Sequence, residues 1–272
     1  MSGRVEIANS IKTGDFFTNY HDRGSAYPVV FLHGSGPGVS AWANWNKLFP
    51  LLENNYRIIA PDMAGFGYSE RLIDSIYGLS LWVQQISDLL TALNLERVNL
   101  VGNSFGGALA IALALNYPEK INKMVLMGSM GVNFALTEGL DKVWGYQPSV
   151  ENMRELLDIF TYDSSFATAD LIKTRYESSI QEGFQESFSR MFPAPRQSSI
   201  AALAAYEDLL PNITQETLII HGREDRVIPL ENSYKLLKLI DKAQLHVFGH
   251  CGHWTQIEHT EEFAQLLLNF FQ

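Results

Sequence analysis

The sequence predicts an α/β fold in which helices cover both faces of a mostly parallel, twisted sheet. Three observations favour this class. Short apolar segments rich in β-branched residues alternate with longer segments in which apolar residues recur at helical spacing. The strand candidates are almost wholly apolar, as strands buried on both faces are. The chain has 272 residues, of which 46% are hydrophobic, so it can bury a large core.

Six segments have the length and composition of buried parallel strands. They are residues 28–32, 56–60, 98–101, 123–127, 217–220 and 244–248. Four longer segments show helical periodicity, and the last of them opens with acidic residues that suit a helix N-terminus. They are residues 79–93, 105–116, 231–240 and 260–271. The alternation of the two sets predicts helices packed over the sheet.

The alternation stops between about residues 129 and 210. This stretch is rich in aromatic residues and interrupted by glycine and proline, and the strand pattern resumes at Thr217. We interpret it as a helical cap inserted into one core rather than as an independent domain. The predicted organisation is a core built from residues 1–128 and 211–272, with a cap over residues 129–210.

Composition excludes several classes of partner. The chain has 20 Lys and Arg against 30 Asp and Glu, a net charge of −10, so we expect no nucleic acid and no anionic membrane as a partner. Cys251 is the single cysteine, which rules out an internal disulfide and a multi-cysteine metal site. No secretion signal or apolar run of about 20 residues is visible. These features predict a cytoplasmic protein.

The segment 98–112 contains the candidate nucleophile. It reads VNLVGNSFGGALAIA, in which a strand runs into GNSFG at residues 102–106 and then into a helix. A nucleophile on a tight strand-to-helix turn needs small residues two positions before and after it, because neighbouring backbone passes too close for a Cβ. This context predicts Ser104 as the nucleophile. The alternative is a surface serine in a glycine-rich turn.

A serine nucleophile needs a histidine base, and an acid must orient that base. Asp225 follows the predicted strand 217–220, and His253 follows the strand 244–248, directly before the final helix. Each lies in a loop at the carboxyl end of a strand, and the order Ser, Asp, His is the one expected for a nucleophile on such a turn. The sequence therefore predicts a triad of Ser104, Asp225 and His253.

Two neighbours compete for these roles, Glu224 as the acid and His250 as the base. The remaining histidines have no pair at the i, i+4 spacing of a helical zinc site, so no metal is predicted. We interpret them as turn, sheet or surface residues. They are His21, His33, His221, His246 and His259.

Acyl chemistry also needs donors for the developing oxyanion. The backbone N–H of Phe105, directly after the nucleophile, supplies the first, and Ser35 or Gly36 in the loop after the first strand supplies the second. The glycines of that loop do not form a dinucleotide-binding motif, because Pro37 lacks an N–H and the G-x-G-x-x-G spacing is not met.

Six segments resemble the meta-cleavage product hydrolases of the α/β-hydrolase fold, and the likeness extends over nearly the whole chain. The segments are HGSGPGVSAWANW (33–45), PDMAGFGYSE (61–70), GNSFGG (102–107), MFPAPRQ (191–197), HGREDRVIP (221–229) and CGHWTQIEH (251–259). This family hydrolyses a carbon–carbon bond in the 2-hydroxy-6-oxo-2,4-dienoates made by ring fission of catechols. The resemblance implies the same reaction here, which yields 2-hydroxypenta-2,4-dienoate and a small carboxylic acid.

The resemblance also implies partners and site residues. An anionic dienoate is the implied small-molecule partner, no cofactor is implied, and a homo-oligomer is compatible with the assemblies that relatives form. By motif position the likeness matches Ser104, Asp225 and His253 to the family triad, and Ser35 or Gly36 with Phe105 to its oxyanion hole. Four residues fall where the family contacts the dienoate end of the substrate: Asn44, Asn103, Arg175 and Trp254.

Charge gives independent support for Arg175. A substrate carboxylate would be repelled by a chain of net charge −10, and a guanidinium in the pocket offers it a bidentate partner. Without the resemblance, a solvated arginine on a cap helix is the simpler interpretation, since Lys173 and Arg190 lie nearby. Asn44 and Trp254 likewise have simpler interpretations, as a helix cap and a packed aromatic residue.

The end of the substrate that bears the acyl group is expected to contact apolar residues of the cap and of the loop after Asp225. They are Leu140, Trp144, Ile200, Val227 and Ile228. Such bulky residues favour formyl or acetyl groups over benzoyl. Two rival functions remain, a carboxylesterase that uses the same triad without a carboxylate clamp, and a ligand receptor that has kept the fold. Enzymes of this fold with an aspartate nucleophile are excluded by Ser104.

Overall fold

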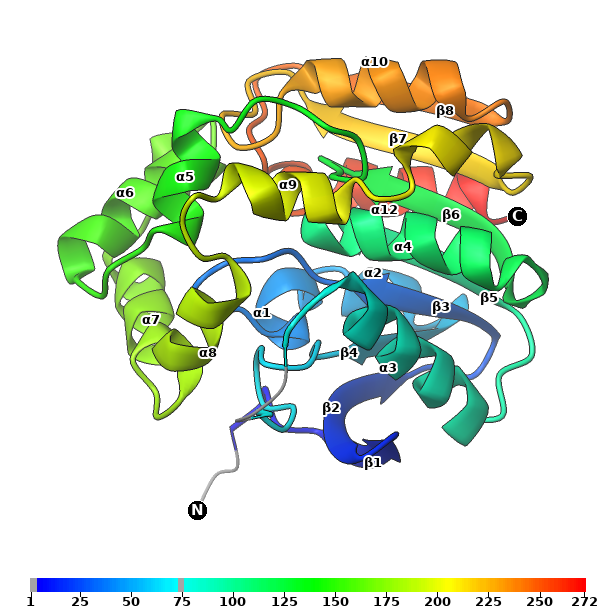
Figure 1. Cartoon of the computed structure of the whole chain (residues 1–272), viewed down its shortest axis with the longest axis horizontal. Helices are drawn as coiled ribbons and strands as arrows, with labels where there is room; N and C mark the ends of the chain where they lie inside the picture. Colours follow the sequence, from blue (N-terminus) through cyan, green and yellow to red (C-terminus); the bar gives the residue numbers. More distant parts are fainter. Residues whose placement is uncertain (1–3, 73–75) are drawn as a thin grey trace.

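The structure, a computed structural model, describes residues 4–72 and 76–272. Its centre is an eight-stranded sheet in the order β1-β2-β4-β3-β5-β6-β7-β8 (Figure 1). The strands are β1 (Asn9–Thr13), β2 (Phe16–Arg23), β3 (Tyr27–Leu32), β4 (Tyr56–Pro61), β5 (Val98–Asn103), β6 (Ile121–Met127), β7 (Glu216–Gly222) and β8 (Ala243–Phe248). β2 pairs antiparallel with both β1 and β4, and every other pairing is parallel.

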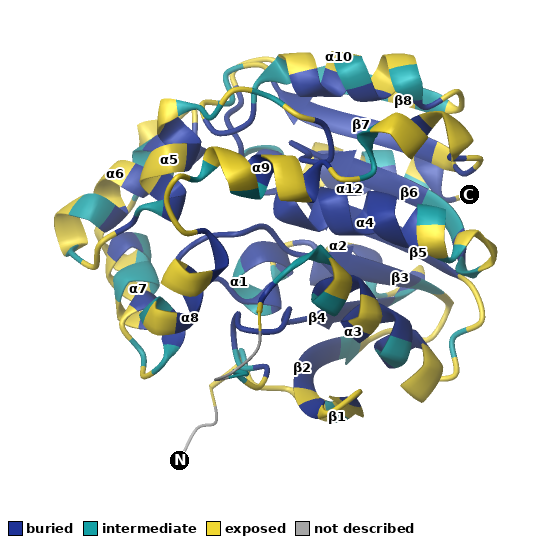
Figure 2. Ribbon diagram, viewed as in Figure 1, coloured by how far each residue is buried: buried dark blue, intermediate teal, exposed yellow. Residues whose placement is uncertain are grey.

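Helices cover both faces of this sheet. One face carries α3 (Leu79–Ala92), α4 (Phe105–Asn116) and α10 (Leu230–Leu239), and the other carries α1 (Ala41–Trp45), α2 (Phe49–Leu52) and α12 (Thr260–Phe270). Alternate residues of each strand enter the two cores: in β3, Val30 and Leu32 pack against the first set of helices and Val29 and Phe31 against the second. This explains why the central strands β3 to β7 are mostly apolar and mostly buried in Figure 2.

The cap lies between β6 and β7 in sequence, although these two strands are neighbours in the sheet. It consists of α5 (Glu138–Trp144), α6 (Val150–Phe160), α7 (Ala169–Ser179), α8 (Phe184–Met191) and α9 (Gln197–Leu203), with the short helices η2 (Ser164–Phe166) and η3 (Glu207–Asn212). In Figure 1 most of the cap, coloured green to yellow, lies beyond one end of the sheet. That end is the one where the parallel strands finish at their carboxyl termini, so the cap covers the loops that carry the predicted triad.

The predicted fold class is confirmed. All six predicted strands occur, and the four predicted helices correspond to α3, α4, α10 and α12 with ends that differ by at most one residue. The sequence analysis did not predict β1 and β2, and it did not predict α1, α2, the 3-10 helix η1 (Pro118–Lys120) or α11 (Thr255–Glu258). Among the residues that the structure describes, no helix has both the length and the apolar character needed to cross a bilayer.

Candidate active site

Ser104 occupies a strained turn between β5 and α4. Its backbone has φ +53° and ψ −111°, a conformation that L-residues rarely adopt. The turn is possible because Gly102 and Gly106 lack side chains: a Cβ on Gly102 would lie 2.4 Å from the Gly106 carbonyl oxygen, and a Cβ on Gly106 would lie 2.2 Å from that of Leu32. The turn is held to the next strand because the Ser104 N–H donates to the Met127 carbonyl over 2.8 Å.

Asp225 and His253 are brought together by the loops after β7 and β8. The Nδ1 atom of His253 lies 2.7 Å from Oδ2 of Asp225, and both side chains are almost fully buried. Asp225 Oδ1 accepts the backbone N–H groups of Val227 and Ile228 over 2.7 and 2.9 Å. Burial alone would raise the pKa of Asp225, but the charge of His253 and hydrogen bonds from His221 and His253 outweigh it and hold that pKa far below its usual range.

His221, at the end of β7, is a second partner of Asp225. Its Nε2 lies 3.2 Å from Asp225 Oδ2 and 3.0 Å from the Ile228 carbonyl oxygen. Because a carbonyl can only accept, Nε2 carries the proton, and Nδ1 accepts from the Ser233 hydroxyl over 2.6 Å. This histidine, which we expected to be a structural residue, therefore helps to orient the carboxylate of Asp225 through Oδ2, the same oxygen that bonds His253.

The loops that carry the three predicted triad residues all leave the carboxyl edge of the sheet. Gly128, directly after β6, is their common neighbour: a Cβ there would lie 3.1 Å from His253 Nδ1 and 3.3 Å from Asp225 Oδ2. Its predecessor Met127 accepts the Ser104 N–H. The hydrogen bonds between described residues do not include one from the Ser104 hydroxyl to His253. The structure therefore joins Asp225 to His253, and Ser104 follows β5, two strands from β7 in the sheet.

The two competing residues have other partners. Glu224 Oε2 accepts the Cys251 N–H over 3.0 Å, while its Oε1 accepts from Arg223. His250 packs against Tyr162 with the ring centres 5.3 Å apart. Of the two acids, the one that bonds His253 is Asp225.

The predicted oxyanion donors lie in two segments, the start of α4 and the loop after β3. Phe105 begins α4, so its N–H has no acceptor within the helix. In the loop after β3, the Ser35 hydroxyl accepts the indole N–H of Trp144, a cap residue, over 2.9 Å. His33 connects this loop to the segment after β4. Its Nδ1 lies 2.8 Å from the Gly34 carbonyl oxygen, and its Nε2 accepts the Met63 N–H over 2.9 Å. Burial lowers the pKa of His33 to about 4, which keeps it neutral.

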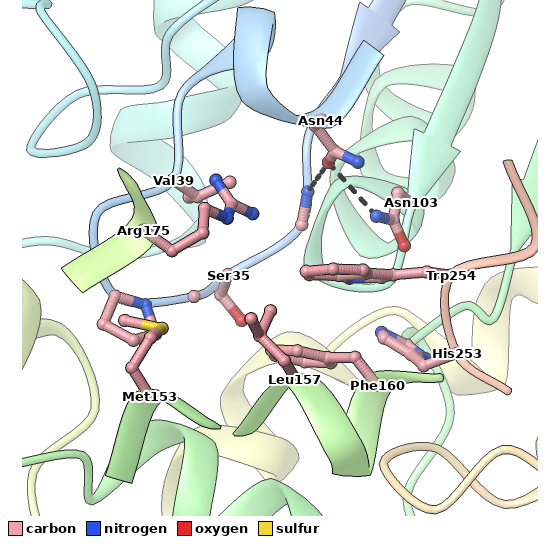
Figure 3. A pocket seen from close by; sticks show the side chains of 13 residues that line it. Ser35, Val39, Asn44, Asn103, Met153, Leu157, Phe160, Arg175, His253 and Trp254 are labelled. Carbon is pink, nitrogen blue, oxygen red and sulfur yellow. Dashed lines mark hydrogen bonds between the residues drawn. The ribbon is translucent and has the colours of Figure 1, made fainter. Parts of the chain in front are cut away.

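A small pocket lies between this loop, the His253 loop and the cap (Figure 3). Its free volume of about 30 Å³ holds one or two water molecules, so lining side chains must move to admit a larger molecule. Among the predicted residues, the lining includes Ser35, Gly36, Asn44, Asn103, Arg175, His253 and Trp254. The sequence analysis missed Val39, Met153, Leu157 and Phe160, which also line it.

Two asparagines form a fixed pair in this pocket. Asn44 Oδ1 accepts the Gly34 N–H over 2.8 Å and the Asn103 side-chain amide over 3.1 Å, as the dashed lines in Figure 3 show. The Gly34 N–H requires an acceptor, which fixes the orientation of Asn44, and Asn103 must then turn its nitrogen toward Asn44. The Oδ1 atom of Asn103 is left buried without a partner among the described residues.

Arg175, on α7, lines the same pocket as this pair. Its Nη1 is buried and has no hydrogen-bond partner among the described residues, and its guanidinium carbon lies 5.4 Å from the ring centre of Trp254. Burial lowers the pKa of Arg175, although an arginine remains charged. Arg175 and Trp254 also line a second, outer cavity of about 640 Å³ between α7, α1 and the N-terminal segment. These two side chains thus stand between the inner pocket and the outer cavity.

The residues expected around the acyl end are all buried beneath the cap. They do not line the pocket of Figure 3, although Trp144 reaches it through its hydrogen bond to Ser35. Trp144 also stacks on Phe192, with ring centres 4.3 Å apart and planes 1° from parallel. Within residues 4–72 and 76–272, no group of three or more His, Cys, Asp or Glu side chains is arranged to hold a metal ion.

The chain is similar to several known proteins over nearly its whole length. The family described as the alpha/beta hydrolase fold matches residues 27–260. A 2-hydroxy-6-oxo-2,4-heptadienoate hydrolase from Pseudomonas putida is 52% identical, over 98% of this chain and 96% of its own. A 2-hydroxymuconate semialdehyde hydrolase from a Pseudomonas species is 53% identical, over 97% and 94%. A solved meta-cleavage product hydrolase from Pseudomonas fluorescens superposes with a TM-score of 0.97 at 56% identity, over 98% of each chain.

Proposed function

The chain belongs to the α/β-hydrolase fold family and, within it, to the meta-cleavage product hydrolases, and we propose on this basis that it hydrolyses 2-hydroxy-6-oxo-2,4-dienoates. The bond cleaved is the carbon–carbon bond between C5 and C6. The products are 2-hydroxypenta-2,4-dienoate and a small carboxylic acid. We place the reaction in the cytoplasm, where Cys251 would stay reduced.

The observation that carries this proposal is a pair of unsatisfied buried groups in one pocket. Arg175 Nη1 is a donor without a partner among the described residues, and Asn103 Oδ1 is an acceptor without one. Leaving such groups buried and unpaired is costly, which points to a ligand that satisfies both. A 2-hydroxy-carboxylate presents acceptor oxygens beside a hydroxyl donor. A simple ester has no carboxylate for Arg175, so the pocket favours the dienoate over the esterase alternative.

The first step of the reaction moves a proton within the substrate. Because His253 donates from Nδ1 to Asp225, its Nε2 carries a lone pair and serves as the base. Nε2 takes the proton of the 2-hydroxyl group and delivers it to C5, which converts the dienol into a ketone with C2=O and C3=C4. The ketone at C2 can then accept the electron pair of the C5–C6 bond.

The second step adds an oxygen nucleophile to the C6 carbonyl. The nucleophile is either the Ser104 hydroxyl or a water molecule, and in both cases His253 takes its proton while Phe105 N–H and a donor from Ser35 or Gly36 stabilise the oxyanion. When the carbonyl re-forms, the C5–C6 electron pair moves to the C2 oxygen, which is reprotonated by His253. The serine route leaves an acyl-enzyme that a water molecule must hydrolyse, so an acyl-enzyme in quenched reactions separates the two routes.

A small acyl group fits this chain best. The two curated relatives are named for a methyl ketone and an aldehyde substrate, and the solved relative is described as a complex with acetates. The side chains expected around this end are all buried and apolar, which suits a small group. They are Leu140, Trp144, Ile200, Val227 and Ile228. We expect methyl and formyl substrates to be turned over faster than isopropyl, and phenyl slowest, whereas equal rates would contradict this part of the proposal.

The experiment that tests the function follows the loss of visible absorbance of ring-fission products. Purified protein is mixed with the products of catechol, 3-methylcatechol and 2,3-dihydroxybiphenyl, beside a Ser104→Ala variant. Fast bleaching of the first two that falls by at least about 1,000-fold in the variant supports the proposal. No bleaching, with p-nitrophenyl acetate still hydrolysed, would show an esterase instead.

A further inference from the structure

Glu258, the last residue of α11, connects two segments that the proposed reaction requires. Its Oε1 accepts the backbone N–H groups of Tyr162 and Asp163 over 2.8 and 3.1 Å, directly after cap helix α6. Its Oε2 accepts the Gly252 N–H over 2.7 Å, and the Cys251 thiol lies 3.8 Å from the same oxygen. One carboxylate therefore binds the cap with one oxygen and the His253 loop with the other.

The two segments are in direct contact beside this carboxylate. The Trp254 N–H donates to the Phe160 carbonyl over 3.1 Å, and the rings of Trp254 and Phe160 stack with centres 4.7 Å apart. Gly252 has no room for a side chain, because a Cβ there would lie 2.7 Å from the Phe160 carbonyl oxygen. Phe160, His253 and Trp254 all line the inner pocket. A shift between the segments would therefore change the pocket and move the base.

Glu224 provides a natural comparison, because it holds the same loop without touching the cap. It accepts the Cys251 N–H, and Glu258 accepts the next N–H along the chain, that of Gly252. The two carboxylates thus fix consecutive amides just before His253. Of the two, Glu258 alone also bonds the cap among the hydrogen bonds of the described residues.

We infer that Glu258 is a positioning residue that locks the cap to the His253 loop and so keeps the base and the Phe160 wall in one relative geometry. The inference rests on the proposed function only for the choice of substrate. Replacing Glu258 by glutamine leaves one acceptor oxygen in place of two, so that either the cap amides or the Gly252 amide loses its partner. Aspartate keeps both oxygens but is one methylene too short to reach both segments.

The test compares Glu258→Gln and Glu258→Asp with Glu224→Gln and with Glu262→Gln, a control at an exposed carboxylate on α12. Steady-state kinetics are measured on the methyl ketone dienoate and on p-nitrophenyl acetate. We expect both Glu258 variants to lower kcat about 5- to 20-fold on both substrates and to raise KM several-fold for the dienoate alone. Glu224→Gln should lower kcat without this change in KM, and Glu262→Gln should match the unaltered protein.

Amide hydrogen exchange gives a readout that does not depend on activity. In the Glu258 variants the amides of Gly252, Tyr162 and Asp163 should all exchange faster. In Glu224→Gln, faster exchange should be confined to amides of the His253 loop. Wild-type exchange at the cap amides, or kinetics that match those of Glu224→Gln, would overturn the inference. If the unaltered protein cleaves no dienoate, the proposed function fails, while the exchange measurement and the ester kinetics still decide the role of Glu258.

Discussion

Arg175 is the residue on which the proposed substrate class depends. Its Nη1 atom is buried and has no hydrogen-bond partner among the described residues, in a chain whose net charge is −10. Leaving a buried guanidinium N–H without an acceptor costs stability. A site that retains it is therefore arranged for an anion, and the adjacent free acceptor on Asn103 selects an anion with a neighbouring hydroxyl group.

Replacing Arg175 by glutamine should separate dienoate from ester activity. A charge-assisted hydrogen bond contributes about 1.5–3 kcal/mol, and the substrate carboxylate would be left without its partner, so kcat/KM for the methyl ketone dienoate should fall about 100-fold. Hydrolysis of p-nitrophenyl acetate should stay within about twofold. Lys173→Gln is the matched control, because Lys173 is an exposed residue of the same helix. Equal losses on the two substrates would contradict the assigned role.

Gly128 offers a test of the triad geometry that leaves the triad residues unchanged. In Gly128→Ala the new Cβ would press on His253 Nδ1 and Asp225 Oδ2 at a position with φ +47°. We expect kcat to fall at least tenfold, with strain costing about 1–2 kcal/mol of folding stability. Gly78→Ala is the control, because nothing lies within 4 Å of a Cβ there and its φ of −170° is extended. Thermal unfolding and kcat are measured for both variants, and unchanged kcat in Gly128→Ala would argue against the proposed catalytic pair.

At the scale of elements, the strands that could be predicted are those in which apolar residues predominate. β2 could not be predicted, because its buried Thr18, Asn19 and His21 are polar, and a sequence does not show which polar groups find partners. Asn19, for instance, donates to Asp62, 43 positions further on. The short edge strand β1 is half exposed and has no apolar alternation to detect.

The same distinction applies to the site. Ser104, Asp225 and His253 could be predicted because each lies in the segment that follows a strand, and the topology brings the ends of parallel strands to one edge. Phe160 could not, since an apolar residue that faces a pocket from a helix has the same spacing as one that faces the core. Glu258 could not be predicted either, because its role depends on a segment 96 positions away.

The loops after β3 and β4 contain two buried titratable groups with opposite pH dependence. Burial raises the pKa of Asp62 to about 6 despite the N–H groups of Tyr68 and Ala41 and the side chain of Asn19, and it lowers the pKa of His33 to about 4. Relative to the unfolded chain, Asp62 makes folding stability rise as pH falls from 6 to 4. His33 makes folding stability decrease as the pH falls from 6.5 to 4. In the native protein these two effects largely offset each other.

The Asp62→Asn substitution should remove the pH dependence of stability that Asp62 contributes and leave the one that His33 contributes. When the pH is lowered from 6.5 to 4, the unfolding free energy of the variant should fall by about 3 kcal/mol more than that of the native protein. Its absolute stability should also be lower, because an amide cannot accept all three hydrogen bonds of the carboxylate. Urea unfolding at several pH values measures the slope, with exposed Asp241→Asn as control. A parallel pH dependence in the native protein and Asp62→Asn would refute the compensation.

Across the whole molecule, the cap is fixed to three of the loops that carry the site. Trp144 donates to Ser35 in the oxyanion loop, Thr137 donates to the Val227 carbonyl in the Asp225 loop, and Trp254 donates to Phe160 from the His253 loop. The cap therefore contributes to the geometry of the catalytic groups as well as to the walls of the pocket. A change in the cap that breaks one of these contacts should affect kcat as well as substrate affinity.

The position of the cap between two paired strands also determines how the chain can fold. β6 and β7 are adjacent in the sheet but separated by roughly 90 residues of sequence, and closing a loop of that length costs about 4 kcal/mol of chain entropy. Such non-local contacts form slowly unless the intervening segment is already compact. The cap helices would shorten this loop if they form first.

Pulse-labelled hydrogen exchange during refolding can detect this order. We expect amides in β3, β5 and β6 to become protected before those in β7 and β8, with cap amides protected no later than β7. Protection of β7 and β8 ahead of the cap would contradict this sequence of events. The insertion that completes the pocket would then also set the slowest step in building the sheet, so that the half of the core bearing Asp225 and His253 is assembled last.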